Sequence, residues 1–150
     1  MWFKNLYLFK FEKSFYKENY YAFDINADYQ EFFITTDDDV RLNALLFKVP
    51  NPKGVVIHYH GNSGNISHWE NRTAIYTDLG YDFFIMDYRG FGKSEGEIVS
   101  EAQLFEDAQL AYDTLLTSYD ESNVIIEGYS VGSGIAAEIA LKNNPKCLML

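Results

Sequence analysis

The sequence contains little cysteine, little basic charge and no long apolar run. Cys147 is its only cysteine, which excludes an intrachain disulfide and any zinc or iron-sulfur site built from several cysteines. The chain has 12 Lys and Arg against 22 Asp and Glu, a net charge of −10, and no basic stripe runs along it. Because proteins bind the phosphate backbone through clustered basic side chains, we expect no nucleic-acid partner. The scarcity of cysteine suits a reducing compartment, and we expect a cytoplasmic location.

The N-terminal part has no stretch of the roughly 18 apolar residues that a membrane span needs, because Lys4 and Lys10 interrupt it. For the same reason it lacks the uninterrupted core of a cleaved signal peptide. Residues 1–17 carry four Lys and one Glu among aromatic side chains, whereas residues 18–40 carry seven acids and no base. We expect residues 1–28 to form an extension whose aromatic part packs on its own domain or makes weak contact with an anionic membrane surface.

Apolar and aromatic residues are abundant. They make up 47% and 17% of the chain, including 12 Phe and 12 Tyr, so the chain can build a core and is not a disordered polymer. Its length of 150 residues suits one domain, since single domains cluster near roughly 100 to 150 residues.

From residue 29 onward, short apolar runs alternate with amphipathic segments. The first two runs are joined by a turn at 36–39, whose acidic side chains we expect to be solvated, and they predict an antiparallel hairpin. Capping-box spacing begins at Ser67 and at Ser100, and Gly80 has the position of a residue that ends a helix. Strands are predicted at 30–35, 42–49, 55–60, 83–87, 123–128 and 147–150, and helices at 67–80, from 100 through 115, and at 131–143.

The repeated β-α-β units predict an α/β fold over residues 29–150, with a mostly parallel sheet, helices on both faces and the hairpin at its N-terminal end. In such folds ligands bind at the carboxyl ends of the strands. Three loops rich in glycine and polar residues follow the third, fourth and fifth strands, at 60–65, 87–96 and 128–132. We therefore expect the functional residues in these loops.

The last of these loops, Gly128-Tyr129-Ser130-Val131-Gly132, matches the pattern G-x-S-x-G between a predicted strand and a predicted helix. So tight a turn holds the serine in a strained backbone and presses the flanking positions together, so that Gly128 and Gly132 must lack side chains. The turn also lifts the Ser130 hydroxyl to a helix N-terminus, where N–H groups stabilise developing negative charge. The pattern predicts Ser130 as a nucleophile.

The loop His60-Gly61-Asn62 follows the third strand. Acyl transfer needs two N–H donors aimed at the oxyanion, one from the residue after the nucleophile and one from the loop after the third strand. The candidates are the backbone N–H groups of Val131 and Asn62. His60 and Gly61 are expected to support this loop.

Three segments together, YHGNSGN (59–65), DYRGFGKSEG (87–96) and GYSVGSG (128–134), resemble the α/β-hydrolase superfamily, and most closely its serine aminopeptidase-like and acyl-hydrolase group. The resemblance covers roughly residues 29–150. It implies a serine hydrolase that cleaves an ester, thioester or amide of a small-molecule or peptide acyl substrate through an acyl-enzyme on Ser130, with no metal and no organic cofactor. It also implies that Asp87, Arg89 and Gly90 shape the loop beside the site.

In this superfamily the acid and the histidine of the triad follow strands beyond the fifth, and no residues of this chain match them. We therefore expect a domain truncated in its sixth strand and a chain that is inactive as it stands. One alternative is a Ser130–His60 dyad, although no carboxylate is evident to orient His60. A metal site on His58 and His60 would lack further ligands. The competing class is a non-catalytic binding module built on the truncated fold.

Overall fold

The computed structural model describes residues 28–150, in which six strands form one sheet of order β1-β2-β4-β3-β5-β6. β2 pairs antiparallel with both β1 and β4, and the other four strands run parallel to one another. The predicted α/β fold, with a mostly parallel sheet and an N-terminal hairpin, is confirmed. The strands are β1 (Asp28–Thr35), β2 (Arg41–Lys48), β3 (Val55–Tyr59), β4 (Asp82–Met86), β5 (Val124–Gly128) and β6 (Cys147–Met149).

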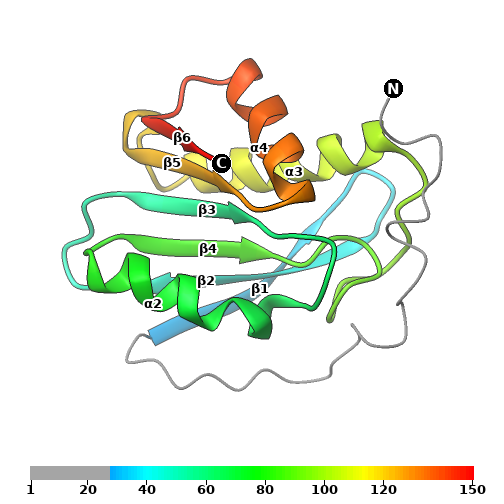
Figure 1. Ribbon diagram of the computed structural model, residues 1–150. Helices are drawn as coiled ribbons and strands as arrows, with labels where there is room; N and C mark the ends of the chain where they lie inside the picture. Colours follow the sequence, from blue (N-terminus) through cyan, green and yellow to red (C-terminus); the bar gives the residue numbers. More distant parts are fainter. Residues whose placement is uncertain (1–27) are drawn as a thin grey trace.

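Helices cover both faces of this sheet (Figure 1). α2 (Glu70–Asp78) packs on one face against β2 and β4, while α3 (Glu101–Leu116) and α4 (Val131–Lys142) pack against each other on the opposite face. Two short 3-10 helices, η2 (Ile66–Trp69) and η3 (Glu121–Asn123), precede α2 and β5. No helix among residues 28–150 is both long and apolar enough to cross a membrane. The membrane contact expected of residues 1–17 lies outside the described residues.

The central strands are mostly apolar because both of their faces are covered. All five residues of β3 and all five of β4 are buried. Side chains alternate between the faces of a strand, so Val55, Ile57 and Tyr59 join the core beneath α3 and α4, while Val56 joins the core beneath α2. This two-sided burial fixes the strands and therefore the loops at their carboxyl ends.

The start of the first helix differs from the sequence prediction. Asn65, rather than Ser67, is the N-cap: its side chain accepts a hydrogen bond from the Ser67 N–H, and the His68 ring accepts one from the Asn65 N–H. Because this reciprocal pair closes a 3-10 turn, the α-helix begins only at Glu70. The other end is as predicted, since Gly80 follows the C-cap with a φ of 84°, a left-handed conformation that favours glycine.

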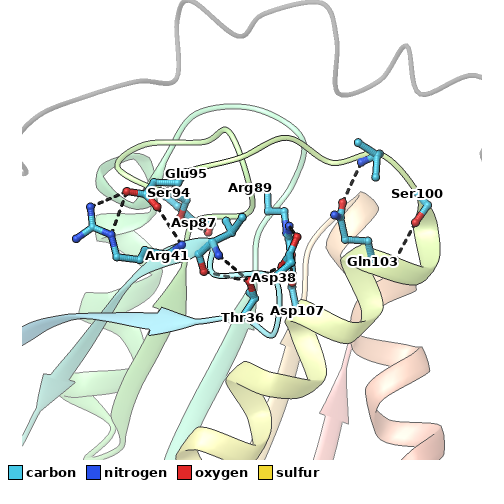
Figure 2. A network of polar contacts seen from close by, with 12 residues as sticks. Thr36, Asp38, Arg41, Asp87, Arg89, Ser94, Glu95, Ser100, Gln103 and Asp107 are labelled. Carbon is cyan, nitrogen blue, oxygen red and sulfur yellow. Dashed lines mark hydrogen bonds and ion pairs between the residues drawn. The ribbon is translucent and has the colours of Figure 1, made fainter.

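A buried arginine ties together three segments at the carboxyl edge of the sheet (Figure 2). Arg89, in the loop after β4, donates to both carboxylate oxygens of Asp107 on α3, over 2.7 and 2.9 Å. It also donates to both oxygens of Asp38 in the β1–β2 turn, over 2.7 and 2.8 Å. The acidic side chains of this turn are exposed, as predicted, but the pairing of Asp38 with Arg89 was not predicted from the sequence. The hairpin turn is thereby clamped to the loop after β4.

We expect Asp38→Asn to lower the free energy of unfolding more at neutral pH than in acid. Hydrogen bonds from Arg89 and Thr36 hold the pKa of the Asp38 carboxyl well below its usual range. An unfolded Asp titrates near about pH 3.9, so the stabilisation is complete above about pH 5 and is lost as the pH falls toward the folded-state pKa. Denaturant unfolding at about pH 7 and about pH 2.5 measures the difference, with Asp37→Asn at the exposed neighbour as control. An equal wild-type-to-variant difference at both pH values would contradict this assignment.

Candidate active site

The turn between β5 and α4 holds the predicted nucleophile in an unusual conformation. β5 ends at Gly128 and α4 begins at Val131, so only Tyr129 and Ser130 connect them. Ser130 is the N-cap of α4, with φ 56° and ψ −120°, a region that non-glycine residues occupy at a cost of about 1–3 kcal/mol. Its side chain makes no capping hydrogen bond and the residue is exposed. The Ser130 hydroxyl thus lies at the N-terminus of α4 and does not cap the helix.

Two glycines allow strand and helix to approach so closely. A Cβ atom on Gly132 would lie 1.9 Å from the Tyr59 carbonyl oxygen and 2.7 Å from that of His60. A Cβ atom on Gly128 would lie 2.5 Å from the Gly132 carbonyl oxygen. Each of these positions therefore excludes any side chain, and the end of β3 lies directly against the first turn of α4.

The loop after β3 lies beside Ser130. A Cβ atom on Gly61 would be 3.6 Å from the Ser130 Cβ and 3.4 Å from the Tyr129 ring, so the chain leaving β3 passes next to the hydroxyl. Asn62 is the next residue of this loop, and Val131 is the first residue of α4. The structure thus brings Ser130, the first residue of α4 and the loop that carries Asn62 to the same end of the sheet.

His60 is buried in this loop. Its Nδ1 lies 2.7 Å from the Gly61 carbonyl oxygen, and a carbonyl only accepts hydrogen bonds, so Nδ1 carries the proton. The ring stacks on Tyr88 at 4.0 Å, and the Tyr88 hydroxyl donates to the His60 carbonyl. Burial lowers the pKa of His60 to about 3, so the imidazole is neutral at physiological pH. Neither ring nitrogen bonds to Ser130 within the described chain.

This hydrogen bond also orients the next peptide unit. In a trans peptide the carbonyl and the following N–H point in opposite directions. The His60 ring holds the Gly61 carbonyl, so it also sets the direction of the Asn62 N–H. His60 therefore lies where it can position a candidate oxyanion donor, rather than where it could take a proton from Ser130.

A buried polar network beside Ser130 was not predicted from the sequence. His58 on β3 and Glu127 on β5 are paired directly across the sheet, with 2.7 Å between Nδ1 and Oε2. Arg72 on α2 donates to the other Glu127 oxygen over 2.5 Å. The sequence does contain one sign of this network, because a histidine and a glutamate interrupt the otherwise apolar runs VVIHY and VIIEG.

A pocket of about 370 Å³ opens beside Ser130. It includes both Ser130 and members of the polar network, so the nucleophile candidate and the network share one space. The lining residues are Arg72, Glu127, Gly128, Tyr129, Ser130, Ser133, Met149 and Leu150.

Comparison with known protein families gives a match that covers most of this chain. Residues 50–150 match the family described as serine aminopeptidase, S33. The chain belongs to this α/β-hydrolase family. The matched region contains every candidate residue of the strand-turn-helix and of the loop after β3.

The relatives that this chain matches are longer than the chain. The α/β-hydrolase domain-containing protein WAV2 of Arabidopsis thaliana is 34% identical over 126 residues, which are 81% of this chain and 40% of WAV2. An α/β hydrolase from Vibrio vulnificus superposes with a TM-score of 0.69 at 28% identity, covering 80% of this chain and 44% of that one. The esterase Pf2001 of Pyrococcus furiosus superposes with a TM-score of 0.60 at 26% identity, covering 73% and 42%. The chain thus spans less than half the length of these relatives.

Proposed function

We propose that this chain supplies the nucleophile and the oxyanion-binding part of a serine hydrolase that acts on an ester, thioester or amide. The observation that carries the proposal is the conformation of Ser130. This residue lies at the N-terminus of α4 with a φ of 56°, and its side chain makes no capping hydrogen bond. A strained residue kept at such a position is typical of functional sites. Membership of a hydrolase family and the likeness to an esterase support the reaction class.

The proposed reaction has two halves. The Ser130 oxygen attacks the carbonyl carbon while a general base takes the hydroxyl proton, and the N–H groups of Val131 and Asn62 bind the oxyanion. The tetrahedral intermediate then expels the alcohol, thiol or amine, which receives that proton, and leaves an acyl group on Ser130. Water attacks this acyl-enzyme with the same base, which releases the acid and restores the serine.

The general base in this proposal is a histidine outside residues 1–150. The sequence contains three histidines, and each has another partner: His58 bonds to Glu127, His60 to the Gly61 carbonyl and His68 to Asn65. The Gly61 carbonyl faces Nδ1 of His60 and the Asp87 carboxylate lies 3.8 Å from its Nε2, so neither nitrogen is bonded to Ser130. Burial also lowers the pKa of His60 to about 3, which makes it a weak base. The greater length of the relatives is consistent with a further segment that carries the base and the acid.

Active-site labelling tests this function. The full-length protein that carries residues 1–150 is treated with a fluorophosphonate, which reacts only with an activated serine, and the modified peptide is mapped by mass spectrometry. We expect a single adduct on Ser130, lost after heat denaturation. An adduct on another serine, or none on the folded protein, would overturn the proposal, and the second result would favour the binding-module alternative.

A further inference from the structure

The His58–Glu127–Arg72 network is a polar cluster with a buried carboxylate, and the proposed reaction does not use it. His58 and Glu127 are paired residues near the carboxyl ends of β3 and β5, and each has apolar neighbours along its strand. The two side chains are 0% and 4% exposed. Burying a carboxylate such as that of Glu127 is costly unless it is paired. Glu127 lies only two residues before Tyr129, which suggests a role for this network beside Ser130.

Glu127 is the centre of the network, and both His58 and Arg72 contact its carboxylate. Oε2 lies 2.7 Å from His58 Nδ1, and Oε1 accepts from Arg72 Nη1. Burial alone would raise the pKa of Glu127, but its contacts with His58 and Arg72 outweigh burial and hold the pKa below the ordinary value. Glu127 is therefore a carboxylate, and each of its oxygens has a partner within the protein. It holds Arg72 in place.

Arg72 is the outward-facing member. Its side chain is 37% exposed, in contrast to the 4% of Glu127. The guanidinium carbon lies 5.5 Å from the centre of the Tyr129 ring, and Tyr129 in turn packs edge-on against Trp69 at 5.2 Å. The bond to Glu127 uses one N–H of a group that has five. Held by a carboxylate and an aromatic face, the guanidinium loses little further freedom when a ligand binds.

The pocket offers few other polar groups. Among residues 28–150, Arg72 is the one basic side chain in its lining. The Ser133 hydroxyl donates to the Gly128 carbonyl over 3.1 Å, and the Glu127 carboxylate has no hydrogen to donate to a ligand. A polar group on the substrate, apart from the reacting carbonyl, therefore meets mainly Arg72.

We propose that Arg72 binds a carboxylate of the substrate while Ser130 attacks its ester or amide carbonyl, so that the enzyme prefers acyl groups with a negatively charged far end. This inference rests on the proposed role of Ser130. Arg72 pairs well with a carboxylate because its planar fork matches the two oxygens, and such charge-assisted bonds are stronger than neutral ones.

Two esters with the same leaving group and the same acyl length test the inference. The full-length protein is assayed with 4-nitrophenyl hemiglutarate and 4-nitrophenyl valerate, after subtraction of the spontaneous hydrolysis of each. We expect Arg72→Met to lower the ratio of kcat/KM for hemiglutarate to that for valerate by about 10- to 100-fold. Arg41→Met, which removes an arginine paired with Glu95 on the surface, should leave the ratio and the activity unchanged.

A second variant guards against misfolding, because Arg72→Met leaves the buried Glu127 without its cation. The double variant Arg72→Met/Glu127→Gln removes both charges, and its ratio should fall as in the single variant. An unchanged ratio in the folded double variant, with Ser130 still labelled by a fluorophosphonate, would overturn the inference and leave the serine hydrolase standing. Absence of Ser130 labelling in the wild type would overturn both.

Discussion

The full-length protein with Ser130→Ala is expected to hydrolyse an activated ester about 10⁴- to 10⁶-fold more slowly than the wild type. Without the hydroxyl no acyl-enzyme forms, and only the N–H groups of Val131 and Asn62 remain to stabilise a direct attack by water. The decrease should appear in kcat, because the hydroxyl acts in the transition state and contributes little to ground-state binding. Steady-state kinetics with 4-nitrophenyl valerate measure it.

The same substitution should leave the fold intact. The Ser130 side chain makes no capping hydrogen bond, so alanine leaves no unpaired group, and the free energy of unfolding should change by less than about 0.5 kcal/mol. Ser130→Gly provides a matched control. Glycine adopts a φ of 56° without strain, so this variant should be equally inactive yet more stable by up to about 1 kcal/mol. Loss of activity together with a gain in stability separates a chemical role from a structural one.

Two results would contradict this account of Ser130. Activity retained in Ser130→Ala would place the nucleophile elsewhere. Ester turnover by residues 1–150 alone, abolished by Ser130→Ala, would place the base within this chain and return His60 to that role. We expect neither, because neither ring nitrogen of His60 bonds to Ser130, and burial lowers the pKa of the ring to about 3, which makes it a weak base.

The features that were predicted correctly depend on residues that are close together along the chain. The strands were recognisable because β3 and β4 are covered on both faces and are mostly apolar. Gly128 and Gly132 were identified from the requirement of a tight turn, and the short distances around them agree with that reasoning. Such features follow from a few consecutive residues, so no knowledge of the sheet order is needed.

The networks could not be predicted in the same way, because they join residues that are distant in the sequence. Arg89 and Asp38 are 51 residues apart, and His58 and Glu127 are 69 apart. Arg89 and Asp38 meet because β2 lies beside β4 in the sheet, and His58 and Glu127 meet because β3 lies beside β5. This strand order differs from the order along the chain. The Asn65 cap was missed for a different reason, since both Asn65 and Ser67 are good capping residues and the tertiary position of the loop decides between them.

Gly132→Ala is expected to destabilise the full-length protein by more than about 3 kcal/mol, or to prevent folding. The added methyl group would overlap the backbone of β3, which cannot move aside without disturbing the sheet. The new Cβ would lie 1.9 Å from the Tyr59 carbonyl oxygen and 2.6 Å from its carbon. Either α4 moves away from β3 or the end of β3 bends, and both displace Ser130 from the loop that carries Asn62. Activity should therefore fall even in molecules that remain folded.

Gly134→Ala is the matched control, because it makes the same chemical change two residues further along the same helix. A Cβ at Gly134 would meet no atom within 4 Å, and alanine is favoured over glycine inside a helix by about 0.5–1 kcal/mol. Gly134→Ala should thus be slightly more stable than the wild type and fully active. Denaturant unfolding and fluorophosphonate labelling of the two variants measure the contrast. Equal stability of Gly132→Ala and Gly134→Ala would show that α4 does not press on the end of β3, and the close approach of Ser130 to the loop after β3 would then lose its physical basis.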